Sequence, residues 1–167
     1  MTASLSAHQI RPATPADMDP LTRLWHAGWH QAHASFVPPD LLQHRTLASL
    51  RPRLDGFGDR LRTAGPTGAP LGFCAIKPDE IDQLYVAPDA MGSGLAARLL
   101  AEGEARLAQA GCHRAHLLCL PENPRAVRFY TRQGWTNAGR ATANLDTLEG
   151  PYPLELFRFE KDLSRHP

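Results

Sequence analysis

The segment Leu84-Tyr85-Val86-Ala87-Pro88-Asp89-Ala90-Met91-Gly92-Ser93-Gly94-Leu95-Ala96 carries the most information in the chain, because a strand pattern passes through a glycine-containing turn directly into a helical pattern. Gly92 and Gly94 lack a Cβ, so the backbone can approach an anion closely. The first amides of the helix have no intrahelical acceptors and would point at that anion with a favourable dipole. The segment therefore predicts a cradle for a diphosphate, although the same glycines also fit a plain tight turn.

A rival interpretation is a dinucleotide-binding turn, because Gly92-x-Gly94-x-x-Ala97 fits that fingerprint. The fingerprint requires an acidic residue about twenty positions downstream, where this chain has Gly111-Cys112-His113. The strands before the turn are also predicted to be antiparallel, whereas the fingerprint belongs to a parallel unit. Nicotinamide-dependent redox chemistry is therefore the weaker interpretation.

The residues on both sides of this turn predict a mixed sheet. Short runs at residues 59–64, 71–77 and 80–86 are separated by turn residues and predict consecutive antiparallel strands. The apolar stripe at residues 94–110 predicts a helix, and a strand should follow at 115–119.

The remaining elements lie nearer the ends of the chain. They are a strand at 9–11, a helix that begins at Thr14, a second helix at 40–50 that ends before Pro52, a helix from Asn123 to Gly134, and strands from 135 and at 154–160. The order predicts an α/β fold of mixed α+β type, with a mostly antiparallel mixed sheet of about seven strands and four flanking helices.

Composition limits the class of protein. The 167 residues, 43% of them apolar, suit a single domain over 1–167, and 18 basic against 17 acidic residues give no nucleic-acid footprint. Three unpaired cysteines predict a reducing compartment, with the cytoplasm as the default. No leader pattern and no apolar run near the roughly 20 residues of a membrane span are seen, so neither export nor a membrane partner is expected.

Two linked motifs resemble the Gcn5-related N-acetyltransferase (GNAT) superfamily. Residues 91–96, Met-Gly-Ser-Gly-Leu-Ala, are similar to the family motif [Gln/Arg]-x-x-Gly-x-[Gly/Ala], with Met91 in place of the usual polar residue. Residues 123–135 are similar to the family's Asn-x-x-Ala-x-x-[Phe/Leu]-Tyr-x-x-x-Gly-[Phe/Trp] pattern. The opening at residues 10–17 and the final strands also fit the family, so the resemblance spans most of the chain.

The resemblance implies acetyl-coenzyme A as co-substrate, with its pantetheine arm wedged between two parallel strands that splay apart in a V. The implied strands end at Val86 and near Cys119, and Asn123 and Tyr130 would lie along the arm. The implied cofactor-binding residues are Leu84, Val86, Met91, Gly92, Ser93, Gly94, Leu95, Ala96, Asn123 and Tyr130.

Acetyl transfer to an amine needs a base for the amine and an acid for the departing thiolate. Tyr130 is the candidate acid, with packing in the core as its alternative role. Glu80 and Asp82 are two apart on one strand, so they share a face and are candidate bases, directly or through water. Glu80 is preferred over Asp82, because it lies eleven residues before Met91, a spacing that resembles the base of histone-acetylating relatives. Its alternative role is a solvated surface carboxylate.

His26, His30 and His33 occur at helical spacing beside Trp25 and Trp29, in a region that in the family helps to wall the acceptor site. No Cys or carboxylate completes a metal-ligand set, so pocket lining or plain surface histidine is expected and a metal site is not.

Two classes of function remain open on the sequence. The first is acetylation of a small-molecule or peptide amine, and the second is a coenzyme-A-binding sensor with little turnover. The acceptor would be set by residues 31–53 and 144–153, which carry no readable motif. Homodimers are common in the family, so a homodimer is a further expectation of the resemblance alone.

Overall fold

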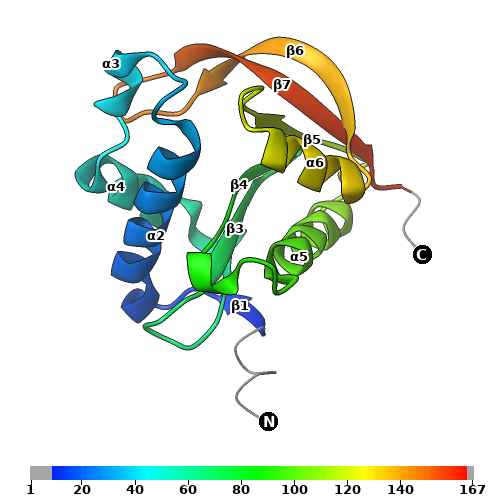
Figure 1. Cartoon of the computed structure of the whole chain (residues 1–167). Helices are drawn as coiled ribbons and strands as arrows, with labels where there is room; N and C mark the ends of the chain where they lie inside the picture. Colours follow the sequence, from blue (N-terminus) through cyan, green and yellow to red (C-terminus); the bar gives the residue numbers. More distant parts are fainter. Residues whose placement is uncertain (1–8, 165–167) are drawn as a thin grey trace.

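A seven-stranded sheet with the order β1-β2-β3-β4-β5-β7-β6 forms the centre of the computed structural model, which describes residues 9–164 (Figure 1). The strands are β1 (Ile10–Pro12), β2 (Leu61–Ala64), β3 (Gly72–Lys77), β4 (Glu80–Val86), β5 (Arg114–Cys119), β6 (Thr136–Leu145) and β7 (Tyr152–Asp162). All neighbouring strands are antiparallel except β4 and β5, which are parallel. The mixed, mostly antiparallel sheet expected from the sequence is confirmed.

Helices cover both faces of this sheet (Figure 1). They are α2 (Pro15–His33), α3 (Pro39–Leu42), α4 (Leu47–Phe57), α5 (Leu95–Gln109) and α6 (Pro124–Arg132), with short 3₁₀ turns at Gly58–Arg60 and Pro88–Ala90. Successive side chains of a strand point to opposite faces, so Phe73 and Ala75 of β3 join a buried cluster with α2 and α4. Cys74 and Ile76 join a second buried cluster with α5.

The prediction of one helix at residues 40–50 was wrong in extent. The region forms α3 and then α4, because Thr46 and Ser49 make a capping box in which the Ser49 amide donates to Thr46 Oγ1 at 3.1 Å. Pro52 lies inside α4 and does not end it, since Leu50, Leu54 and Phe57 continue a buried face. Five α-helices, instead of the predicted four, therefore flank the sheet within residues 9–164.

The parallel pair β4 and β5 separates almost as soon as it forms. Glu80 and His116 are its one register pair in the described chain. The outer edges stay paired, since β4 follows β3 as far as Val86 opposite Gly72, and β5 follows β7 as far as Cys119 opposite Phe157. The inner edges of the two strands therefore diverge in a V, as the resemblance implied.

Within residues 9–164, no helix has both the length and the apolar character that crossing a bilayer requires.

Asp17 joins three parts of the chain at the start of α2. Its buried carboxylate accepts hydrogen bonds from Arg11 Nη1 at 2.7 Å, the Thr14 amide at 2.8 Å and the Gly68 amide at 2.9 Å. The Arg11 guanidinium is the main cause that holds the pKa of Asp17 well below its usual range. A depressed pKa in the folded state means that the stabilisation is present above the pKa of the unfolded chain, about 4, and is lost as the pH falls below it.

We expect Asp17→Asn to lower the free energy of unfolding at pH 7 by roughly 2 kcal/mol, because buried donors lose a charged acceptor. The variant should also lose less stability than the wild type between about pH 4 and pH 2. Urea unfolding at several pH values measures both effects. Asp19→Asn is the matched control, since Asp19 is 75% exposed in its ion pair with Arg51, and should behave as the wild type. Equal losses in the two variants would contradict this role.

Candidate active site

The turn between β4 and α5 has the geometry of an anion cradle. Gly92 and Gly94 adopt left-handed backbone angles, with φ of 79° and 86°, which side-chain-bearing residues rarely adopt. A Cβ built on either glycine meets no other atom within 4 Å, so both positions face open space. Helix geometry leaves the amides of Gly94, Ala96 and Ala97 without intrahelical acceptors, and these are the donors that a diphosphate needs.

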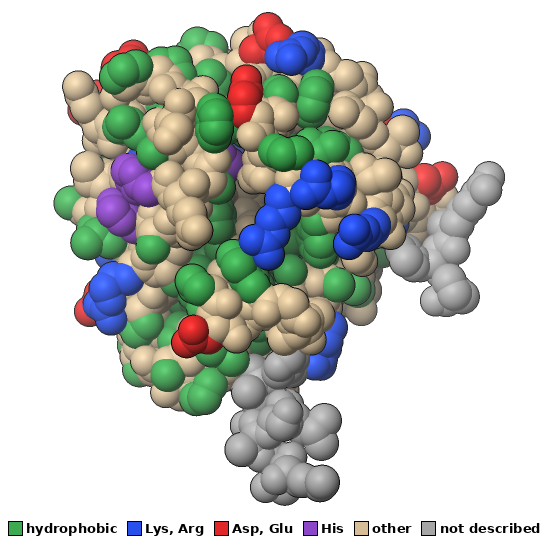
Figure 2. All heavy atoms as spheres, in the orientation of Figure 1, with side chains coloured by type: hydrophobic (Ala, Val, Ile, Leu, Met, Phe, Trp, Pro, Cys, Tyr) green, Lys and Arg blue, Asp and Glu red, His purple; other side chains and the backbone are tan. Residues whose placement is uncertain are grey.

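Side chains in and near the cradle have separate roles. Ser93 Oγ donates to the Ala90 carbonyl at 2.5 Å and accepts from the Leu95 amide at 3.3 Å, so its hydroxyl braces the turn. Met91, at the family's polar position, is 42% exposed. Figure 2 shows Lys and Arg side chains gathered over the face that carries α5 and α6. The exposed arginines on these helices include Arg98, Arg125 and Arg128. The residues present therefore fit a polyanionic group.

A narrow slot of about 120 Å³ lies between the diverging strands β4 and β5. Its walls include Leu84 of β4 and Leu117–Cys119 of β5, and Asn123 and Tyr130 of the α6 region contribute further. Because β4 and β5 pair only at their start, the inner backbone groups further along have no partner strand. Such groups can hydrogen-bond an extended amide-containing chain.

Tyr130 is packed within this slot between aromatic neighbours. Its ring centroid lies 5.2 Å from that of Phe129 and 6.0 Å from that of Phe159. Burial raises the pKa of Tyr130 far above its ordinary value, so the phenol stays protonated and able to donate. Cys119 is in the same slot, and burial raises the pKa of its thiol to about 11. A neutral Cys119 is a poor nucleophile, so the slot does not favour a covalent route through this residue.

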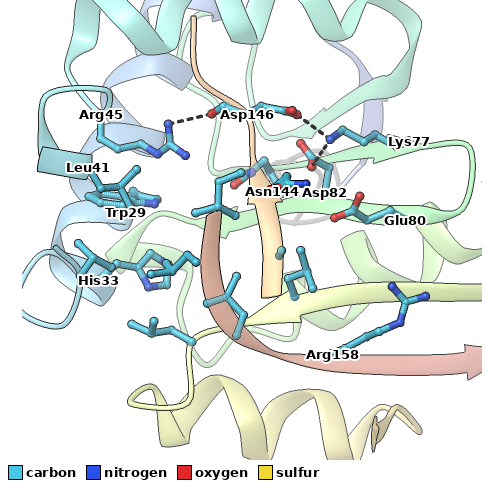
Figure 3. Close-up of a pocket in the computed structure, with 18 of the residues that line it drawn as sticks. Trp29, His33, Leu41, Arg45, Lys77, Glu80, Asp82, Asn144, Asp146 and Arg158 are labelled. Carbon is cyan, nitrogen blue, oxygen red and sulfur yellow. Dashed lines mark hydrogen bonds and ion pairs between the residues drawn. The ribbon is translucent and has the colours of Figure 1, made fainter. Parts of the chain in front are cut away.

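A second cavity of about 310 Å³ lies between the helices α2 to α4 and the strands, as Figure 3 shows. On the helical side it is walled by Trp29, His33, Leu41 and Arg45. The strand side carries the polar residues Lys77, Glu80, Asp82, Asn144, Asp146 and Arg158. Both segments that the sequence named as acceptor determinants, 31–53 and 144–153, contribute to this lining.

The slot and the cavity share one wall. The residues that line both are His33, Asp82, Gln83, Tyr85, Leu118 and Leu120. A group that lies in the slot is therefore next to a group in the cavity. This arrangement suits a transfer reaction between two bound molecules.

The two candidate bases lie in this region, and a β-bulge separates their environments. Ala75 pairs with Gln83 and Ile76 with Ile81, which leaves Asp82 as the extra residue on β4. Glu80 and Asp82 both line the cavity, as expected, but Asp82 alone of the two also lines the slot.

The carboxylates also differ in their partners. Asp82 Oδ1 lies 3.4 Å from Lys77 Nζ, and its buried Oδ2 has no hydrogen-bond partner among residues 9–164. Burial is the main cause that raises the pKa of Asp82. Glu80 Oε2 lies 3.5 Å from His116 Nε2, at the closed end of the V.

Of His26, His30 and His33, it is His33 that lines both the slot and the cavity. Its Nε2 lies 3.4 Å from the Tyr85 hydroxyl, and burial lowers its pKa to about 4, so it is neutral at pH 7. The rings of His26 and His30 contact each other in a tilted arrangement, with centroids 4.3 Å apart. His30 Nε2 lies 2.7 Å from the Arg45 carbonyl oxygen, so it also braces the α3–α4 connection.

The cavity residues that were not singled out from the sequence include Arg45, Arg53, Lys77 and His116. They come from three separate parts of the chain, and none belongs to a motif. A signal for His116 was present in the sequence. Parallel pairing of the strand that begins at Glu80 with the strand that contains His116 places these two residues side by side.

Comparison with known proteins gives the family. A model of the acetyltransferase (GNAT) family matches residues 21–135. The peptidyl-lysine N-acetyltransferase YjaB of Salmonella typhimurium is 32% identical over 85 residues, which are 51% of this chain and 54% of that protein. The matched part of the chain therefore spans about half the length of this curated relative.

Solved structures show the same fold. A GCN5-related N-acetyltransferase from Rhodopseudomonas palustris superposes with a TM-score of 0.71 at 24% identity, covering 92% of this chain and 94% of that one. The structure of yncA from Salmonella typhimurium, solved with its cofactor acetyl-CoA, superposes with a TM-score of 0.65 at 18% identity, and the match covers 95% of both chains. Because the family model covers most of the sequence, this chain belongs to the acetyltransferase (GNAT) family, as its two motifs predicted.

Proposed function

We propose that the chain is an acetyl-CoA-dependent N-acetyltransferase that acetylates a primary amine, and that residues 1–167 form one domain for this purpose. The observation that carries the proposal is the shared wall of the slot and the cavity, with Asp82 between them. Family membership and the acetyl-CoA bound to the related yncA structure support the choice of donor.

The donor would lie along the cradle and the slot. The free amides of Gly94, Ala96 and Ala97 would hold its diphosphate, and the unpaired inner edge of β4 near Leu84 and Val86 would hold the amides of its pantetheine arm. Asn123 is less free to contribute than the family pattern suggests, because its Oδ1 already accepts from the Ala126 amide at 3.2 Å. The Asn123 side-chain NH₂ group can still donate to the arm.

The reaction needs two proton transfers. As the amine attacks the thioester carbonyl, a C–N bond forms and the C–S bond breaks. Asp82 or Glu80 takes the proton that the amine loses, directly or through water, and Tyr130 gives a proton to the departing thiolate. Of the two carboxylates we favour Asp82, because it lines both cavities and its raised pKa makes it the stronger base.

The alternative function, a coenzyme-A-binding sensor, is favoured by Met91 at the family's polar position and by the ion pair that links Asp82 to Lys77. Release of free thiol from acetyl-CoA in the presence of a panel of amines decides between the two functions. Binding of coenzyme A without thiol release from any amine would support the sensor and contradict the enzyme.

The cradle is tested by Gly94→Ala. A Cβ at this position would occupy the open space proposed for the diphosphate, so the Kd for coenzyme A in calorimetric titration should rise at least roughly tenfold. Gly111→Ala is the matched control, since Gly111 follows the other end of α5 with φ of 94° and open space around it. Both variants carry a similar backbone strain of roughly 1–2 kcal/mol, seen in thermal unfolding. Equal affinity for coenzyme A in the two variants would argue against the cradle.

The acid is tested by Tyr130→Phe. The variant keeps the ring and loses the proton donor, so kcat should fall roughly 100-fold while the Kd for coenzyme A changes by less than about threefold. Tyr152→Phe is the control, because Tyr152 donates to Asp40 at the surface and lines neither cavity. An unchanged kcat in Tyr130→Phe would show that Tyr130 is a packing residue.

The base is tested by comparing Asp82→Asn with Glu80→Gln across pH. If Asp82 is the base, Asp82→Asn should lower kcat roughly 100-fold or more and remove the acidic limb of the pH–rate profile. Because burial raises the pKa of Asp82, that limb in the wild type should lie above the range of an ordinary aspartate. Glu80→Gln should keep the limb. The reverse pattern would assign the role to Glu80, and a limb kept in both variants would point to a water chain.

A further inference from the structure

Two arginines reach the acceptor cavity without a carboxylate partner. Arg45 is only 3% exposed, and the bonds of its Nη1 go to the carbonyl oxygens of His44 at 3.1 Å and Asp146 at 3.0 Å. Arg53 has a buried Nη1 for which residues 9–164 provide no hydrogen-bond acceptor. Both side chains line the cavity, so most of their N–H donors are available to a ligand.

Aromatic rings hold both guanidinium groups in place. The Arg45 guanidinium carbon lies 5.6 Å from the ring centroid of Trp29, and that of Arg53 lies 4.8 Å from the centroid of Trp25. Each cation therefore lies over an aromatic ring, and a guanidinium can bind a carboxylate through two parallel hydrogen bonds.

Lys77 pairs with two of the acidic side chains of the cavity. Lys77 Nζ lies 2.6 Å from Asp146 Oδ2 and 3.4 Å from Asp82 Oδ1. Within the described chain, no carboxylate forms an ion pair with Arg45 or Arg53. Burial lowers the pKa of both arginines, that of Arg45 to about 10, so both remain charged at neutral pH. The carboxylates of Asp82 and Asp146 act on both cations only from beyond ion-pair distance. A desolvated cation without a counter-charge in contact is unfavourable, and an anionic ligand would relieve this cost.

We propose that the acetyl acceptor is a small molecule that carries a carboxylate as well as its amine, with an amino acid as the simplest case. This inference rests on the proposed function and names its substrate class. Arg45 and Arg53 bind the carboxylate, and the amine lies toward Asp82 and the slot. The cavity of about 310 Å³ is at the small end of the range for ligand sites, which favours a free amino acid over a peptide.

The test compares acceptors in matched pairs. Each amino acid is assayed against its own primary carboxamide, and β-alanine and 4-aminobutyrate are assayed against alkylamines of the same length. At least one carboxylate-bearing acceptor should have a kcat/KM at least roughly tenfold above that of its partner. The amine of an α-carboxamide is the less basic of its pair, so amine ionisation alone would produce the opposite preference. A panel in which the partners without a carboxylate are equal or better overturns the inference.

Variants of Arg53 test whether this residue causes the preference for carboxylate-bearing acceptors. Arg53→Gln should raise the KM of the carboxylate acceptor roughly tenfold or more and leave the carboxamide unchanged, and Arg53→Lys should restore part of the preference. Arg51→Gln is the matched control on the same helix, because Arg51 pairs with Asp19 and Asp55 outside the cavity. It should keep the full preference. If Arg53→Gln slows both acceptors equally, Arg53 only supports the fold, and the inference is wrong.

The failures of the two proposals can be told apart. If no amine releases thiol from acetyl-CoA, the proposed function fails and the substrate class fails with it. If polyamines or other amines without a carboxylate are acetylated while their carboxylate-bearing counterparts are not, the function stands and the carboxylate site is rejected.

Discussion

The separation of β4 and β5 is the constraint on which the rest of the structure depends. The two strands share one register pair, Glu80 and His116, and each is held on its outer edge by a longer antiparallel ladder. The ladders prevent the inner edges from closing on each other, so backbone donors and acceptors remain exposed inside the molecule. Unpaired backbone groups are costly in a protein interior, and a ligand with amides of its own can satisfy them. The V is therefore a site whose shape is set by the sheet.

Helices form the two binding regions on either side of this V. The N-terminus of α5 follows β4 directly and provides free amides at the open end, where the strands have diverged. On the other side, α2 to α4 and the strands together enclose the cavity lined by the arginines and carboxylates (Figures 1 and 3). The bulge at Asp82 lies where the two spaces meet, and the same residue lines both. A donor and an acceptor can thus approach each other from opposite sides of one strand.

The sequence was sufficient to predict the features that depend on residues close together in the chain. The turn at Gly92 and Gly94, the helix after it and the alternating strands were predictable because glycine conformation and periodicity act over a few residues. Periodicity does not predict the division of residues 40–50 into two helices, because the capping box at Thr46 starts a second helix and Pro52 lies inside that helix. The sequence named segments 31–53 and 144–153 of the cavity lining, but not its charged residues, because Arg45, Arg53 and Lys77 meet through tertiary packing and share no motif. The bulge at Asp82 depends on the register with β3, which the sequence of β4 alone does not contain.

The central claim is that the inner edges of β4 and β5 are completed by coenzyme A. Amide hydrogen exchange with and without coenzyme A measures this most directly, because exchange reports hydrogen bonding at each backbone group. We expect coenzyme A to slow exchange at residues 82–86 of β4, 117–119 of β5 and 92–97 of the cradle, with little change in β1 and β2. If coenzyme A binds and leaves exchange in β4 and β5 unchanged, the V is not its site and the account is wrong.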